Sequence, residues 1–279
     1  MGRAQRRQEQ AQLPICQLDP ALSVTNSSEQ VPTFYVHGFR GGNYTTQKMV
    51  SSAQEMTQTP VFLRATVDWR SKIHYSGYWS TAKNPIIQLV FKDRWIPSST
   101  IERWFNQILT DLNQRYHFQS YNAVGHSLGA KALVNFLIHN PGHTLPPINR
   151  LVLVAGPFDG LVFLGDLPNI NPLAADGRPA FMTPNYMWTY LNRSRFPAHT
   201  KVLNIYGNVE DSSNTDKYVS VSSARSIKYI LQAQVQEFRE YNARGQSGEH
   251  SQLHDDVSIL KMINQFIYDP EKLPPLTKD

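Results

Sequence analysis

Residues 121–129 read Tyr-Asn-Ala-Val-Gly-His-Ser-Leu-Gly, and they carry the most informative pattern in the chain. The last five of these residues match the pattern G-x-S-x-G. This pattern lies between a short apolar segment, Tyr121–Val124, and an apolar segment with helical spacing, Ala130–His139. A sharp strand-to-helix turn needs small residues on both sides of its centre, and the two glycines of the pattern provide them. We therefore expect Ser127 to project above the end of a strand, with the N-terminus of a helix behind it.

Short apolar segments alternate with helical patterns along most of the chain. The expected strands are Thr33–Val36, Val61–Asp68, Lys72–Thr81, Ile86–Phe91, Tyr121–Val124, Arg150–Ala155, Lys201–Tyr206 and Ala233–Tyr241. The expected helices are Thr45–Met56, a helix that begins at Ser98 or Ser99, Ala130–His139, Val221–Leu231 and Val257–Ile267. This alternation predicts an α/β fold with a mostly parallel central sheet and helices on both faces.

The length of 279 residues suits one large domain. Residues 1–30 combine a polar start with an irregular lead-in, so we expect an N-terminal tail there and one α/β domain over residues 31–279. Residues 157–200 stand apart because they are rich in proline and aromatic side chains. We interpret them as a cap insertion. Its aromatic side chains either form a core beneath the insertion or line an apolar acyl pocket and exclude water.

The composition argues against several classes of protein. The net charge of +5 is mild and the only basic cluster comprises Arg3, Arg6 and Arg7, whereas a nucleic-acid binder usually has a denser basic face. Cys16 is the only cysteine, which excludes an intrachain disulfide and a multi-cysteine metal site. No apolar run approaches the roughly 20 residues of a membrane span. The first residues do not have the pattern of a secretory signal.

A serine hydroxyl is a weak nucleophile at neutral pH. It becomes reactive when a histidine takes its proton and a carboxylate orients that histidine. With this kind of strand-to-helix turn, the acid follows the serine along the chain and the histidine comes last. The strand after the cap is followed by the carboxylates Glu210, Asp211 and Asp216. Two histidines, His250 and His254, precede the last helix.

The sequence favours one member of each set. Asp216 is the preferred acid because it lies just before the next expected helix, and Asp211 is its alternative. His250 is the preferred base because a glycine-rich loop before it gives it freedom to reach the serine, and His254 is its alternative. A metal site on the two histidines would need a third ligand, and Asp255 lies on the wrong face of a helix to supply it. No metal is expected.

An ester carbonyl under attack develops negative charge on its oxygen, which preorganised backbone N–H groups stabilise. The residue after the serine, Leu128, provides one such group. The second is expected from the loop after the first strand, where Gly38 follows His37 and allows a tight turn, and Phe39 comes next. The sequence therefore predicts an oxyanion hole formed by the N–H groups of Phe39 and Leu128.

Several segments occur together in order: residues 37–39, 82–88, 124–129, 155–160, 203–207, 222–223, 228–229 and 250–254. Over about residues 31–268, this set resembles the "cell-surface hydrolase" family of α/β-hydrolases from Gram-positive bacteria. The resemblance implies an α/β-hydrolase fold, a triad of Ser127, Asp216 and His250, activity on esters, and no cofactor. It also suggests an extracellular or cell-surface location, with a cytoplasmic location as the alternative because no signal peptide is visible. The family often has glycine after the acid, whereas this chain has Lys217, so Asp211 stays open as a rival.

The expected function is therefore that of a serine hydrolase that cleaves a small-molecule carboxylic ester through an acyl-enzyme. Two alternatives remain. The fold could serve as a surface binding protein without catalysis, or the same triad could act in an acyltransferase or a peptidase.

Overall fold

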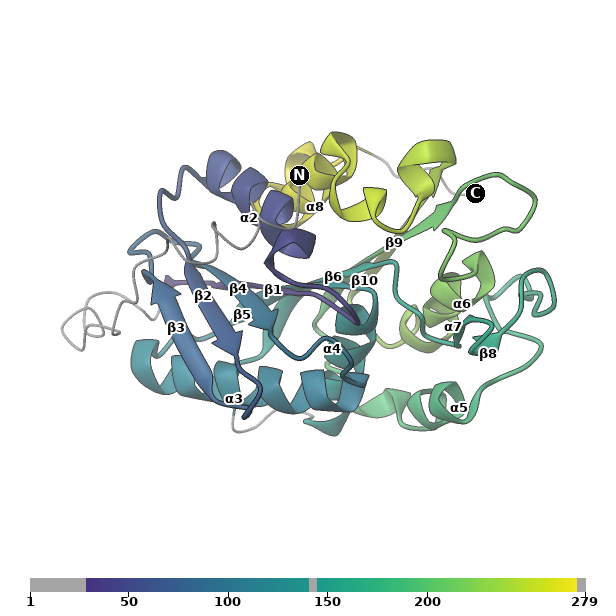
Figure 1. Cartoon of the computed structure of the whole chain (residues 1–279), viewed down its shortest axis with the longest axis horizontal. Helices are drawn as coiled ribbons and strands as arrows, with labels where there is room; N and C mark the ends of the chain where they lie inside the picture. Colours follow the sequence, from purple (N-terminus) through teal and green to yellow (C-terminus); the bar gives the residue numbers. More distant parts are fainter. Residues whose placement is uncertain (1–28, 141–144, 275–279) are drawn as a thin grey trace.

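One sheet of eight strands lies at the centre of residues 29–140 and 145–274, which the computed structural model describes (Figure 1). Its strands are β1 (Thr33–Val36), β2 (Leu63–Val67), β3 (Ile73–Gly77), β4 (Ile86–Phe91), β5 (Tyr121–His126), β6 (Ile148–Val154), β9 (Lys201–Asn208) and β10 (Glu237–Arg244). Their order in space is β10-β9-β6-β5-β1-β4-β2-β3. Neighbouring strands are parallel except β2 and β3, which form an antiparallel hairpin at one edge.

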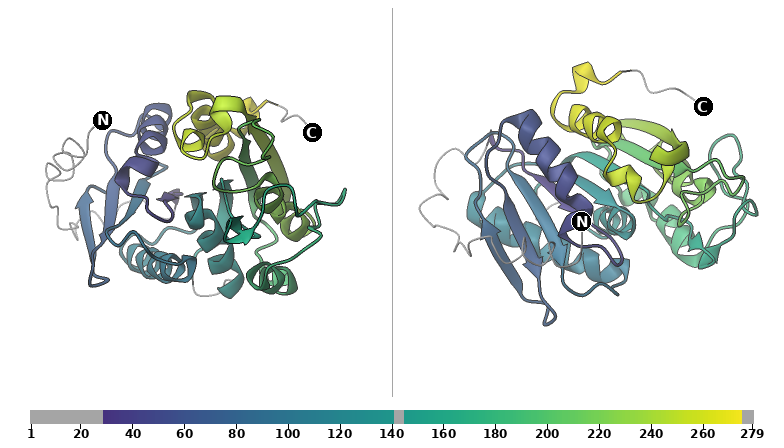
Figure 2. Two further views of the ribbon diagram at one scale, coloured as in Figure 1. Left: turned by 45° about the vertical axis from the view of Figure 1, so that its right-hand side comes forward. Right: turned by 45° about the horizontal axis from the view of Figure 1, so that its top comes forward.

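Helices cover both faces of this sheet (Figure 1). They are α2 (Asn43–Thr57), α3 (Ser98–Tyr116), α4 (Leu128–His139), α5 (Pro184–Leu191), α6 (Val221–Arg225), α7 (Ile227–Leu231) and α8 (Val257–Tyr268). Short 3₁₀ turns occur at η3 (Arg193–Arg195), η4 (Gly245–Gly248), η5 (Gln252–His254) and η6 (Pro270–Lys272). The helices α2 and α8, far apart in the sequence, lie side by side on one face (Figure 2), while α3 and α4 pack on the other.

The apolar pattern of the sequence explains this layering. The three central strands β1, β4 and β5 are buried along their whole length, as parallel strands covered on both faces must be. The helix predicted from Ser98 or Ser99 is α3, and it buries one apolar stripe against the sheet: Ile101, Trp104, Phe105, Ile108, Leu109 and Leu112. Each such side chain contributes roughly 1.5–3 kcal/mol when it leaves water.

The predicted fold class is correct, and most predicted boundaries shift by a few residues. The helix α3 begins at Ser98, one of its two expected first residues, and the extended Pro97 is its N-cap. Two of the differences have an identifiable cause. The predicted helix Val221–Leu231 is interrupted at Ser226, whose carbonyl accepts a hydrogen bond from the Tyr186 hydroxyl at 2.9 Å. The last strand starts at Glu237 because a turn first bonds Gln234 and Val235 back to the Leu231 carbonyl.

Residues 157–200 form no strand of the central sheet among the described residues. They contain a small two-stranded ladder of β7 (Leu161–Val162) and β8 (Gly165–Asp166), followed by α5. The buried carboxylate of Asp159 ties the segment together, since it accepts hydrogen bonds from the Thr183 backbone N–H at 2.7 Å and the Asn171 amide at 3.1 Å. Burial raises the pKa of Asp159.

Most of the predicted N-terminal tail, with Cys16 and the basic cluster, lies outside the described residues. None of the helices that the structure does describe combines the length and the apolar character needed to cross a membrane.

Candidate active site

Ser127 occupies the turn between β5 and α4. Its backbone φ of 56° and ψ of −128° lie outside the regions that ordinary residues prefer, so the turn stores strain of about 1–3 kcal/mol. The surroundings explain both flanking glycines. A Cβ on Gly125 would lie 2.7 Å from the Cα of Ala130, and one on Gly129 would lie 2.5 Å from the carbonyl oxygen of Val36. This is the tight strand-to-helix geometry that places a serine at the carboxyl edge of the sheet. Ser127 is only 7% exposed there, and it lines a cavity.

Asp216 and His250 meet directly. The Asp216 Oδ2 lies 2.7 Å from the Nδ1 of His250, and the His250 backbone N–H donates to the Asp216 carbonyl at 3.0 Å. The second carboxylate oxygen, Oδ1, accepts the backbone N–H groups of Tyr218 at 2.9 Å and Val219 at 2.7 Å. Asp216 is buried and every one of these contacts fixes its orientation. The carboxylate is therefore held where it can fix one tautomer of the imidazole.

The alternative acids are placed differently. Asp211 is exposed and binds the backbone and side chain of Ser213, and these hydrogen bonds lower its pKa. Glu210 lies 3.6 Å from Arg244. In the described part of the chain, the Asp211 carboxylate bonds to Ser213, whereas the Asp216 carboxylate bonds to His250. The structure thus brings Asp216, rather than its two rivals, to His250.

The alternative base, His254, lies beside the same cavity, but its Nδ1 faces Asp255 at 2.9 Å. His126 separates the two histidines, with ring centroids 4.8 Å from each. The Nε2 of His126 lies 3.1 Å from the His250 carbonyl oxygen. Burial, with the nearby His250 and His254, lowers the pKa of His126 well below its usual range, so the ring is neutral and donates this bond. The sequence did not reveal this hydrogen bond between His126 and the His250 carbonyl, because His126 occupies a variable position of G-x-S-x-G.

The loop after β1 lies against the serine turn. A Cβ on Gly38 would lie 2.6 Å from the backbone nitrogen of Leu128, so no side chain fits between the loop and this N–H group. The buried His37 holds the loop in place. Its Nε2 accepts the Phe91 backbone N–H at 3.0 Å, which leaves Nδ1 to donate to the Gly38 carbonyl at 2.9 Å. Phe39 follows directly and lines the cavity above Ser127.

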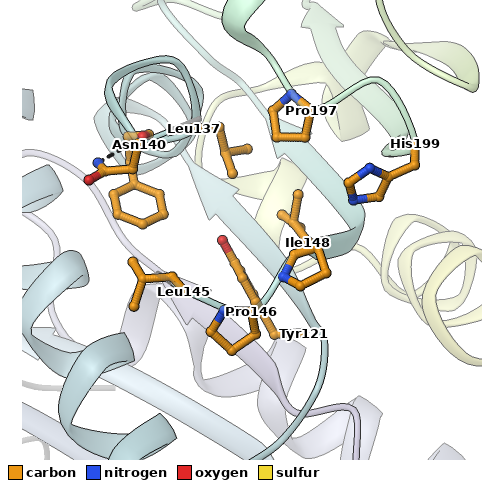
Figure 3. A pocket seen from close by; sticks show the side chains of 10 residues that line it. Tyr121, Leu137, Asn140, Leu145, Pro146, Ile148, Pro197 and His199 are labelled. Carbon is orange, nitrogen blue, oxygen red and sulfur yellow. Dashed lines mark hydrogen bonds between the residues drawn. The ribbon is translucent and has the colours of Figure 1, made fainter. Parts of the chain in front are cut away.

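A cavity of about 480 Å³ joins these groups, because Phe39, Ser127, Leu128, His250 and His254 all line it. A second hollow of about 400 Å³ lies at the opposite edge of the sheet, where β5 and β6 begin (Figure 3). That hollow is lined largely by apolar residues such as Leu145, Pro146 and Pro197 and contains no acid (Figure 3). Within the described part of the chain, no group of three or more His, Cys, Asp or Glu residues could hold a metal ion.

Comparison with known proteins gives the family. The model of the family described as "Alpha/beta hydrolase of unknown function (DUF915)" matches residues 22–270. The chain belongs to this family. No curated protein matches the sequence.

Two solved structures share the fold of this α/β-hydrolase over most of its length. The product of the gene lin2722 from Listeria innocua is 25% identical, with a TM-score of 0.78 over 90% of this chain and 96% of that one. A candidate cell surface hydrolase from Lactobacillus plantarum WCFS1 is 23% identical, with a TM-score of 0.67 over 90% of this chain and 94% of that one. The resemblance read from the sequence is therefore correct.

The contact between Gly38 and Leu128 predicts a large loss of activity in Gly38→Ala. The added methyl group must push the loop off the Leu128 N–H. If this N–H is an oxyanion donor, as the sequence predicts, we expect kcat to fall roughly 10²–10³-fold. Steady-state hydrolysis of 4-nitrophenyl butyrate measures this loss. The matched control is Gly42→Ala in the same loop, where a Cβ meets only the Tyr44 ring at 3.0 Å. Equal rates in the two variants would contradict the assigned position of the oxyanion hole.

His37 predicts how stability depends on pH. Burial lowers its pKa to about 4 in the folded chain, against about 6.5 when unfolded. Its contribution to the free energy of unfolding is therefore complete above pH 6.5 and is lost as the pH falls towards 4, by up to about 3 kcal/mol. Urea unfolding at pH 7 and pH 4 should show a smaller pH effect in His37→Gln than in the wild type, since glutamine does not titrate. An unchanged difference between the two pH values would refute this.

Proposed function

We propose that this chain is a serine hydrolase that cleaves carboxylic esters through an acyl-enzyme. One observation carries the proposal: His250, whose Nδ1 lies 2.7 Å from the Asp216 carboxylate, lines a cavity that Ser127 also lines. Ser127 is the proposed nucleophile, His250 the base and Asp216 the orienting acid. The backbone N–H groups of Phe39 and Leu128 are the proposed oxyanion donors.

The proposed reaction has two halves. The Ser127 hydroxyl attacks the ester carbonyl while the Nε2 of His250 takes its proton, and the carbonyl oxygen becomes negative against the two N–H groups. Collapse of this intermediate expels the alcohol, which receives the proton from His250. Water then enters, loses a proton to His250 and attacks the acyl-enzyme, which releases the acid and restores Ser127. Asp216 holds Nδ1–H throughout and stabilises the transient imidazolium.

The proposal includes a single domain over residues 31–279, with residues 157–200 as a cap. In support, Leu161, Val162 and Leu164 from this segment line the cavity beside Ser127. An apolar wall of this kind excludes water from the acyl-enzyme and contacts the uncharged part of an ester. No step of the proposed reaction needs a metal or an organic cofactor.

A fluorophosphonate probe tests the proposal directly, because it reacts only with an activated serine. We expect the wild-type protein to be labelled and to hydrolyse 4-nitrophenyl butyrate. A wild-type protein that does neither would be a binding protein on a hydrolase fold. Labelling without ester hydrolysis would instead indicate an acyltransferase or a peptidase with the same triad.

The name of the Lactobacillus plantarum relative assigns that protein to the cell surface. We extend this location to the present chain as part of the proposal. Protease treatment of intact producer cells should digest the protein, and full protection from the protease would exclude a surface location.

A further inference from the structure

The cavity above Ser127 has two chemically different walls. Arg40 and Arg94 line one part of it, while Leu161, Val162 and Leu164 line another. None of the cavity-lining residues in the described structure is an aspartate or a glutamate. A substrate that fills the cavity therefore meets two guanidinium groups without an acidic side chain beside them.

Hydrogen bonds between Arg40 and Arg94 join the two loops that carry them. The Arg40 backbone N–H donates to the Arg94 carbonyl at 2.8 Å, and the Arg94 guanidinium donates in return to the Arg40 carbonyl through Nε and Nη2. The same Nη2 lies 3.0 Å from the hydroxyl of Tyr44. These contacts occupy Nε and Nη2 and leave Nη1 of Arg94 without a partner among the described residues. Two donors of a positioned guanidinium are thus available to a ligand.

The Arg40 side chain is also placed without a carboxylate partner. Its guanidinium carbon lies 5.1 Å from the ring centre of Trp95, and in the described structure the guanidinium donates no hydrogen bond. The Arg40 backbone has a φ of 56°, a left-handed conformation that costs an ordinary residue about 1–2 kcal/mol. Its N–H donates to the Arg94 carbonyl and its own carbonyl accepts from the Arg94 guanidinium, so these contacts hold the loop in this conformation.

The sheet order places these walls on opposite sides of the serine. Ser127 follows β5. On one side, Arg40 follows the neighbouring strand β1 and Arg94 follows β4, the next strand beyond it; on the other side, the apolar wall follows β6. An ester bound at Ser127 thus has one half against the arginines and the other half against aliphatic side chains.

We propose that Arg40 and Arg94 form an anion subsite. The preferred substrate is then an ester with one apolar half and one half that carries a negatively charged group such as a carboxylate. This inference rests on the proposed function of Ser127. Guanidinium groups suit this role because they bind carboxylates and phosphates through paired hydrogen bonds. The anion can belong to the acyl half or to the alcohol half, and the experiment below distinguishes the two.

Two pairs of esters that differ only in charge test the subsite. Mono-4-nitrophenyl adipate and its methyl ester place the charge on the acyl half. The compound 4-(butanoyloxy)benzoate and its methyl ester place it on the alcohol half. In one of these two pairs, we expect the charged ester to have a kcat/KM about 10-fold above that of its methyl ester at low ionic strength. A 10-fold ratio corresponds to about 1.4 kcal/mol. The ratio should fall as salt is added, because both arginines are exposed.

Variants connect the ratio to the arginines. Arg40→Gln should lower the ratio of kcat/KM between the charged and neutral esters several-fold. The backbone carbonyl at position 40 can still accept the hydrogen bonds from Arg94. Arg94→Gln should lower the ratio too, and Arg94→Lys, which keeps the charge, should retain more of it. Arg115→Gln is the matched control, since it removes the same charge at the far end of α3, where Arg115 pairs with Asp111. It should leave the ratio unchanged.

The outcomes separate this inference from the proposed function. A wild-type protein that hydrolyses the neutral esters and reacts with the fluorophosphonate probe, but shows no charge preference in either pair, overturns the anion subsite alone. A preference that survives both Arg40→Gln and Arg94→Gln also overturns it. A protein that neither reacts with the probe nor hydrolyses any of the four esters refutes the proposed function and the inference with it.

Discussion

Ser127→Ala is expected to lower kcat for 4-nitrophenyl butyrate on the order of a million-fold, to the level set by binding and the oxyanion hole alone. Alanine keeps the backbone of the turn but removes the oxygen that we propose forms the acyl-enzyme. Labelling by a fluorophosphonate probe should disappear together with turnover. The melting temperature should stay close to that of the wild type, since the Ser127 side chain does not cap α4.

The control for this variant is Ser99→Ala, a serine in the first turn of α3 that is exposed and not among the cavity-lining residues. It should keep both turnover and labelling. An Ser127→Ala protein that hydrolyses the ester at the wild-type rate would show that another group is the nucleophile.

Asp216→Asn is expected to lower kcat about 10⁴-fold. The asparagine oxygen can still accept the two backbone N–H groups of Tyr218 and Val219, so the local fold should persist. The asparagine NH₂ group then faces His250 Nδ1, and two donors cannot share a hydrogen bond. The imidazole must place its proton on Nε2, where it can no longer act as the base. Steady-state kinetics at pH 7 measure the loss.

Asp211→Asn is the matched control because it makes the same chemical change in the acid that the sequence left as a rival. The exposed Asp211 contacts Ser213, so its variant should keep near-wild-type kcat. If Asp211→Asn were the inactive variant and Asp216→Asn the active one, the orienting acid would have been misassigned.

The fold was predictable because its evidence is local. The apolar segment of β5, the glycines beside Ser127 and the stripe of α3 each follow from period and side-chain size. Boundaries were less predictable where distant groups intervene. The break at Ser226 depends on a hydroxyl 40 positions away in the chain, that of Tyr186, and no periodicity in residues 221–231 reveals it.

The candidate site was predictable in part for the same reason. The G-x-S-x-G pattern and the order of acid and histidine identify a small set of candidates, but only their positions in space separate Asp216 from Asp211. The roles of His37 and His126 were not visible, because a histidine that is buried and neutral looks the same in sequence as one that is exposed. The two arginines were missed since they belong to different loops, after β1 and β4, that meet only in the folded chain.

Mass spectrometry of the fluorophosphonate-treated protein, followed by peptide mapping, determines whether Ser127 is the activated nucleophile. We expect one adduct per chain, located on Ser127, whose formation is prevented by replacing His250 with glutamine. An adduct on a different residue, or none on the wild-type protein under conditions that label a known serine esterase, would contradict this assignment.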